Sequence, residues 1–76
     1  MSDFPVLTGS DMVKALQRGG FFVVRQKGSH VRMASLQDPA KRVTIPIHAH
    51  RSLKRGLLLS ILEQAGWTIT ELRTHL

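Results

Sequence analysis

The sequence contains no cysteine, and only five of its 76 residues are acidic. Without cysteine the chain forms no disulfide, has no thiolate nucleophile and cannot bind zinc through sulfur. The carboxylates are scattered over the N-terminus, turns and helix faces: Asp3, Asp11, Asp38, Glu63 and Glu71. This distribution excludes a two-metal nuclease and a hydrolase that depends on a pair of carboxylates.

Long apolar runs are also absent. No stretch approaches the roughly 18 apolar residues of a membrane helix, and residues 1–7 are expected not to be a signal peptide. The chain has no glycine-rich phosphate loop, internal repeat or low-complexity segment. These absences, with the short length, predict a single domain over residues 1–76 and a cytoplasmic location.

Positive charge is abundant. Eleven Lys and Arg residues against five acidic residues give a formal net charge of +6. Such a field on a small body attracts polyanions, so nucleic acid is the first expected partner, ahead of an anionic membrane or an acidic protein. DNA is the weaker nucleic-acid candidate because no recognition-helix motif is visible.

The periodicity of apolar residues predicts an α+β fold. Thr8 as an N-cap and the pair Gly19-Gly20 bound a first helix at Gly9–Arg18. Alternating segments separated by turn residues then predict three antiparallel strands, at residues 21–24, 30–34 and 42–45. An apolar stripe ending at Gly66 predicts a second helix over 57–65, and a capping box at Thr68–Glu71 opens a short third helix. Residues 1–7 are expected to be a loose lead-in.

The element order α-β-β-β-α requires two amphipathic helices to cover one face of the sheet. The expected core is Leu16, Phe21 or Phe22, Val31, Met33, Val43, Ile45, Leu58, Ile61 and Leu62. The other face stays open and carries His30, Arg32, Arg42 and Thr44. The facing of the first strand stays undetermined, because residues 21–24 are all apolar.

His30 is the strongest candidate for chemistry. It follows Gly28-Ser29 at a junction between turn and strand, with Arg25 and Lys27 close in sequence. An imidazole both takes and gives a proton near neutral pH. RNA supplies its own nucleophile, the 2′-hydroxyl, so its cleavage needs only a base, an acid and positive charge at the phosphate. The alternative is a surface histidine in a hairpin.

A second basic segment precedes the second helix and contains His48, His50, Arg51, Lys54 and Arg55. Two histidines without a nearby acid or cysteine make a poor metal site, so no metal or other cofactor is expected. The segment either adds positive charge to a phosphate path beside a helix amino end or is a solvated basic loop. Trp67 is expected to be a packing residue.

Several motifs follow one another in order: Gly20-Phe21, the run RQKGSH at 25–30, VTIPIH at 43–48, Lys54-Arg55-Gly56, and SILEQAG at 60–66. This ordered set, from about Thr8 to Leu72, resembles the HicA toxins, the ribonuclease partners in HicA–HicB toxin–antitoxin systems. The resemblance implies a fold like that of a double-stranded RNA-binding domain and ribosome-independent cleavage of mRNA. It also implies that His30 is catalytic and that a HicB antitoxin masks its face.

The residues expected to contact RNA are Lys27, Gly28, Ser29, Arg32, His48, Arg51, Lys54 and Arg55. The second proton-transfer residue stays open between His48 and Lys27. The sequence departs from the family pattern at Leu57, where the family often has threonine, and in the extra histidine at position 50. Two alternatives remain: a double-stranded-RNA-binding module without catalysis, and an interaction protein that docks an acidic partner.

Overall fold

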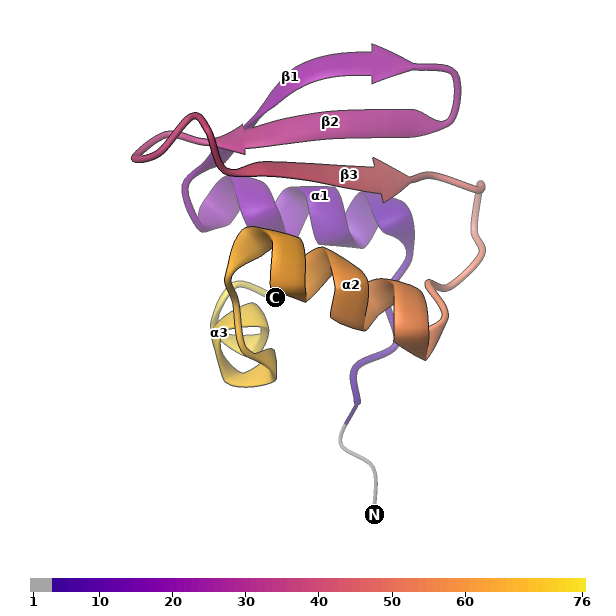
Figure 1. Ribbon diagram of the computed structural model, residues 1–76. Helices are drawn as coiled ribbons and strands as arrows, with labels where there is room; N and C mark the ends of the chain where they lie inside the picture. The colour runs from indigo at the N-terminus through magenta and orange to yellow at the C-terminus, as the bar shows by residue number, and fades with distance from the viewer. Residues whose placement is uncertain (1–3) are drawn as a thin grey trace.

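The protein is described by a computed structural model that covers residues 4–76. Its elements, in chain order, are α1 (Gly9–Arg18), β1 (Phe21–Lys27), β2 (His30–Ser35), β3 (Arg42–Pro46), α2 (Arg55–Ala65) and α3 (Ile69–Thr74) (Figure 1). The strands form one antiparallel sheet in the order β1-β2-β3. This topology confirms the predicted α+β fold of the double-stranded RNA-binding-domain type. No helix among the described residues is long and apolar enough to span a membrane.

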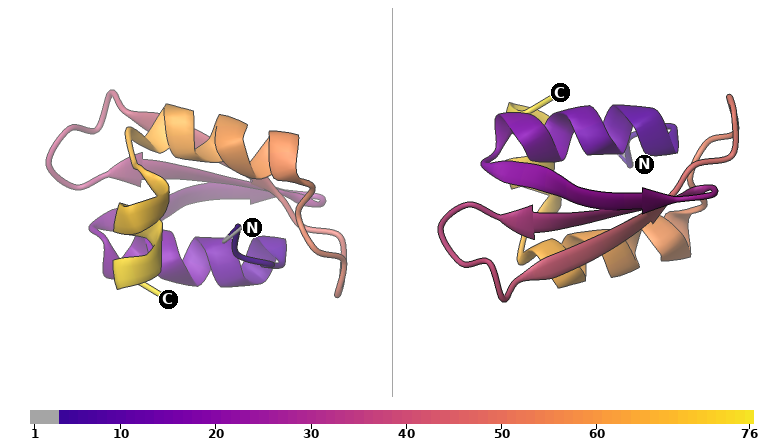
Figure 2. Two further views of the ribbon diagram at one scale, coloured as in Figure 1. Left: turned by 90° about the horizontal axis from the view of Figure 1, so that it is seen from below. Right: turned by 90° about the horizontal axis from the view of Figure 1, so that it is seen from above.

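The helices all lie on one side of the sheet. Figure 2 shows α1 and α2 side by side under this face, with α3 crossing one end of the pair. The apolar residues predicted for the core are buried between the layers. At the uncertain position in β1, Phe21 is 5% exposed and Phe22 is 38% exposed, so Phe21 faces the helices. The other face of the sheet is left open.

Local hydrogen bonds determine where the helices begin. In α1 the Thr8 hydroxyl accepts from the Asp11 amide at 3.1 Å, and the Thr8 amide donates to the Asp11 carboxylate at 3.1 Å. The bonds from the Thr8 backbone and side chain lower the pKa of Asp11, because they stabilise the ionised carboxylate. Thr68 and Glu71 form the same capping box at α3. Both caps were predicted from the sequence, and both are confirmed.

The strands are longer than the sequence predicts. β1 continues to Lys27, and β3 includes Pro46, which pairs with His30. Proline is tolerated there because β3 is an edge strand and the nitrogen of Pro46 points away from β2. The ladder even extends one bond further, since the Ile47 amide donates to the Ser29 carbonyl at 2.6 Å. The β1–β2 turn is thereby fastened to the segment that follows β3.

The segment before α1 packs against the loop that precedes α2, although it has no regular secondary structure. Met1–Asp3, the first part of the expected lead-in, lie outside the described residues. Leu7 is buried, and its carbonyl accepts from the Leu53 amide at 2.6 Å. The Arg55 guanidinium carbon lies 4.9 Å from the centre of the Phe4 ring. These contacts connect the basic loop to the start of α1.

Gly9 allows α1 to approach the end of β3 closely. A Cβ atom at Gly9 would lie 2.4 Å from the Pro46 carbonyl oxygen, which is a backbone atom. We therefore expect Gly9→Ala to lower the free energy of unfolding by about 1–3 kcal/mol, although alanine is the better helix former. The control is Gly56→Ala in the first turn of α2, where a Cβ meets nothing within 4 Å. Urea unfolding followed by circular dichroism should show Gly56→Ala unchanged or more stable; equal effects of both changes would contradict this account.

Candidate functional site

A bulge in β1 determines which of its side chains reach the open face of the sheet. Val23 pairs with Met33 and Arg25 pairs with Arg32, so Val24 is an extra residue between two regular ladders. Residues paired across a sheet lie on the same face. Met33 is buried in the core and Arg32 is exposed. Val23 therefore lies on the helix side, and Arg25 lies on the open face.

Without the bulge, strict alternation from the buried Phe21 would turn both Arg25 and Lys27 towards the helices. The extra residue reverses the alternation, and Lys27 pairs directly with His30. Bulges commonly re-aim side chains next to functional sites. Here the bulge brings two cations of β1 to the face that carries His30.

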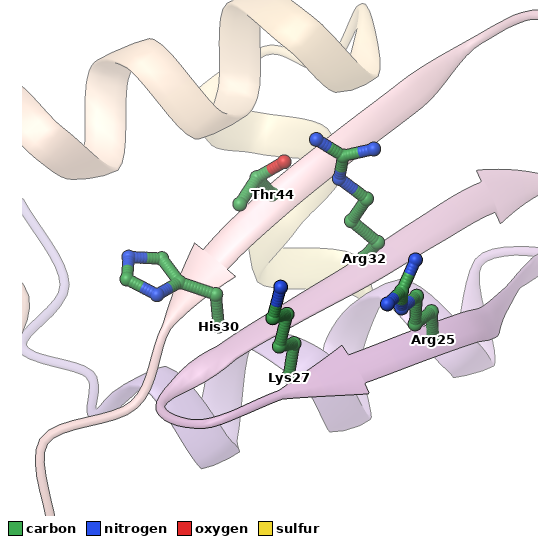
Figure 3. Close-up of a pocket in the computed structure, with 5 residues that line it drawn as sticks. All are labelled: Arg25, Lys27, His30, Arg32 and Thr44. Carbon is green, nitrogen blue, oxygen red and sulfur yellow. The ribbon is translucent and has the colours of Figure 1, made fainter.

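The side chains gathered there line a hollow of about 360 Å³. Its walls are Arg25, Lys27, His30, Arg32 and Thr44. Figure 3 shows two of these residues on β1, two on β2 and Thr44 on β3, all rising from the same face. The Thr44 amide donates to Gln64 Oε1 at 3.1 Å, which ties β3 to α2 below the hollow. Three adjacent strands thus build one site.

The hollow is electropositive and contains a free imidazole. Three of its five lining residues are Lys or Arg, and none is acidic. Within residues 4–76 the exposed His30 ring makes no hydrogen bond to another residue. An imidazole in this state keeps one ring nitrogen as an acceptor and one as a donor when neutral. The arrangement can bind a phosphate and exchange a proton beside it.

The predicted RNA-binding residues fall into two groups. Lys27 and Arg32 line the first hollow with His30. A second hollow of about 140 Å³ is lined by Pro46, His48, Arg51, Ser52, Leu53, Lys54 and Leu57. Leu57, the position where the family often has threonine, therefore offers this second hollow an apolar side chain instead of a hydroxyl.

The other predicted site residues lie at or beyond the edges of these hollows. Gly28 and Ser29 form the β1–β2 turn, and Gly28 has a positive φ of 58° that suits glycine. The two hollows are neighbours, because His30 of the first pairs with Pro46 of the second across β2 and β3. Arg55 lines neither hollow and lies over the Phe4 ring instead.

Arg25 is a lining residue that the sequence-based set of RNA contacts omitted. Only a prediction of the Val24 bulge could have placed it on the open face. Arg42 is exposed on β3 as expected, but it does not line the hollow. Its Nε donates to the Pro39 carbonyl at 2.9 Å, so its side chain is engaged with the β2–β3 connection.

No cluster of metal ligands was found in the part of the chain that the structure describes. Among residues 4–76, no three His, Asp or Glu side chains gather in a way that could hold an ion. His48 and His50 are exposed, and His48 belongs to the second hollow, which has no acidic lining residue. The ionisable side chains that line the first hollow are one imidazole, one ammonium and two guanidinium groups.

The fold and the hollow together define a small α+β protein of the double-stranded RNA-binding-domain type with a histidine-centred basic site. Comparison with known protein families matches residues 9–67 to the HicA toxin of bacterial toxin–antitoxin systems. The match covers most of the chain, including both hollows, and the chain belongs to the HicA toxin family. Membership implies an antitoxin partner of the HicB type. No curated protein matches the sequence.

Two single-residue deletions test whether the bulge positions Arg25. Deleting Val24 removes the register shift between the two ladders, so every remaining side chain keeps its face. Deleting Gln26 also removes one residue, but a regular ladder from Lys27 backwards would then turn Arg25 towards the helices. We expect RNA affinity within about twofold of the parent after the first deletion. After the deletion of Gln26, we expect the plot of log affinity against log salt concentration to become less steep by about 0.7. This is the change in slope for one lost phosphate contact to single-stranded RNA.

Fluorescence anisotropy with a labelled RNA at several salt concentrations measures both quantities. Circular dichroism of each variant checks that the sheet has formed. Equal losses of affinity in the two deletion variants would show that the bulge does not determine the position of Arg25.

Proposed function

We propose that this chain is the toxin of a toxin–antitoxin pair and cleaves mRNA as an endoribonuclease, without a metal ion and without the ribosome. The observation that carries this proposal is the hollow on the open sheet face. It holds one exposed imidazole, His30, with Lys and Arg side chains around it, and among residues 4–76 no carboxylate lines it. This set of groups suits cleavage of a phosphodiester that supplies its own nucleophile.

In the proposed reaction His30 removes the proton from a ribose 2′-hydroxyl. The 2′-oxygen attacks the adjacent phosphorus, and the bond from phosphorus to the 5′-oxygen of the next nucleotide breaks. The leaving oxygen takes up a proton, which yields a 2′,3′-cyclic phosphate and a 5′-hydroxyl end. Arg25 and Arg32 stabilise the charge that develops on the phosphate oxygens.

Lys27 is favoured over His48 as the second participant. Lys27 pairs directly with His30 across the β1–β2 ladder, and both residues line the same hollow. Directly opposed residues have Cβ atoms only about 5 Å apart. His48 belongs to the other hollow. A lysine ammonium at this position can donate a proton to the leaving oxygen or stabilise the phosphate charge.

The second hollow extends the proposed RNA path. His48, Arg51 and Lys54 line it, and Pro46, which also lines it, pairs with His30 of the first hollow. An RNA strand that crosses the pair of His30 and Pro46 would place successive phosphates near both groups of cations. Arg51 and Lys54 would then hold the RNA backbone, while the reacting phosphate stays at His30.

The proposed antitoxin contact is the same open face. A HicB-type antitoxin with an acidic surface would cover the hollow around His30 and exclude RNA. Toxin, antitoxin and mRNA would meet in the cytoplasm. Inhibition would then be direct competition for one basic site.

The deciding experiment incubates the purified chain with a mixed-sequence single-stranded RNA and with an RNA duplex in the presence of a chelator. We expect fragments from the single strand whose ends carry 2′,3′-cyclic phosphate, identified by mass spectrometry. A duplex that is bound but stays intact, with the single strand also uncut, would instead support the non-catalytic double-stranded-RNA-binding module.

A further inference from the structure

Beyond the basic hollow, the open face of the sheet carries two exposed apolar side chains, near Arg42, whose side chain is bonded to the Pro39 carbonyl. Phe22 on β1 is 38% exposed, and Leu36, just after β2, is 66% exposed. Phe22 pairs with Ala34. The Leu36 amide donates to the Gly20 carbonyl at 2.8 Å, so pairing continues past the end of β2. Alternation therefore places Phe22 and Leu36 on one face.

These two apolar side chains lie next to the hollow. Ala34 is only 1% exposed although it belongs to the open face, so the side chains around it close over it. Arg32 lies two residues from Ala34 along β2 and lines the hollow. Two residues of a strand span about 7 Å. The patch of Phe22 and Leu36 thus begins where the basic hollow ends.

We infer that Phe22 and Leu36 form an apolar anchor for the antitoxin, next to the basic hollow that the antitoxin also covers. This inference rests on the proposed function, in which the antitoxin binds the His30 face. The partner must present an apolar side chain to the anchor and, beside it, carboxylates to the hollow. Protein interfaces commonly have this composition, with a desolvated apolar centre and charged groups around it.

A protein partner fits the patch better than RNA does. Single-stranded RNA stacks its bases on aromatic rings, and Phe22 is the one aromatic residue of the patch. Leu36 is aliphatic and the more exposed of the pair. Aliphatic side chains give a polyanion little to bind, whereas their burial by another protein is favourable. The two parts of the open face therefore bind different partners. The hollow binds both RNA and the antitoxin, and the anchor binds the antitoxin.

The test is a double variant, Phe22→Ser with Leu36→Ser, titrated calorimetrically with a HicB-type antitoxin that binds the parent chain. We expect the Kd to rise by about 30-fold or more, as for loss of an interface hot spot, while the rate of RNA cleavage stays within twofold of the parent. The control is Leu59→Ser on α2, which is similarly exposed but lies on the helix layer. Phe22→Leu keeps an apolar anchor without an aromatic ring, so it should bind the antitoxin normally.

Thermal melts of all variants confirm that each is folded at the assay temperature. Unchanged antitoxin affinity in the double variant would overturn the inference. A loss of RNA affinity in Phe22→Leu, with antitoxin binding intact, would assign Phe22 to base stacking and overturn it as well. Failure of the parent chain to cut RNA would count against the proposed function alone, because the antitoxin titration does not depend on cleavage.

Discussion

Replacing His30 with alanine should slow RNA cleavage by about 10²–10⁴-fold, the usual cost of losing a positioned acid or base. The loss is expected because no other imidazole lines the hollow. Stability should stay within about 0.5 kcal/mol of the parent, as for other exposed substitutions, since the His30 ring makes no hydrogen bond within residues 4–76. RNA affinity should also be nearly unchanged, because the neighbouring cations remain.

Single-turnover cleavage of a labelled RNA, measured with chelator present, separates this loss of rate from a loss of binding. The matched control is His50→Ala, which removes another exposed histidine that lines neither hollow. His48→Ala tests the remaining candidate for the second proton transfer. Cleavage by His30→Ala at the parent rate, together with inactivity of His48→Ala, would move the reaction to the second hollow.

The parts of the fold that could be predicted from the sequence are those with local signals. Thr8 was predicted to be an N-cap and Thr68–Glu71 to be a capping box, and both threonines cap their helices as expected. Gly66 ends α2 with a φ of 73°, the left-handed conformation that glycine adopts readily. The clean alternation of β2 and β3 likewise predicted which residues enter the core. In each case the determining contacts lie within a few residues.

The facing of β1 could not be predicted, because it depends on contacts between distant residues. Phe21–Val24 is apolar at every position, so no alternation distinguishes its faces. The register with β2 places the bulge at Val24. Arg25 lines the hollow only because this bulge reverses the alternation of β1. The separation of the predicted RNA contacts into two hollows also depends on tertiary structure, since the Ile47–Ser29 bond joins segments that are far apart in sequence.

The second large effect is expected from replacing Trp67, which should lower the stability of the fold. Its ring meets Phe21 edge-on, with 5.8 Å between ring centres, and stacks on His75 at 4.8 Å. A Cβ at Gly19 would lie 2.2 Å from the indole, so the ring fits closely against the end of α1. The His75 carbonyl accepts from Arg18 at 2.9 Å. Trp67 therefore packs between the end of α1 and α3, which confirms that it is a packing residue.

Trp67→Ala should lower the free energy of unfolding by about 3 kcal/mol, the low end for removal of a packed aromatic ring, because the indole is half-buried. A domain of this size has a total stability of only about 4–11 kcal/mol. The melting temperature should therefore fall by more than about 10 °C. Trp67→Phe keeps an aromatic contact with Phe21 and should lose less, and Leu76→Ala, at an exposed position, should lose almost nothing.

Unfolding of these variants must be followed by circular dichroism, because Trp67 is the single tryptophan and the chain has no tyrosine. Cleavage measured well below the melting temperature should stay close to the parent rate. The reason is distance: α3 lies at the end of the sheet opposite the β1–β2 turn, and Lys27 and His30, which flank this turn, line the hollow (Figure 1). A Trp67→Ala variant that melts like the parent would show that α3 is not held by this ring. A folded variant that fails to cut would show that the packing of α3 also supports the site.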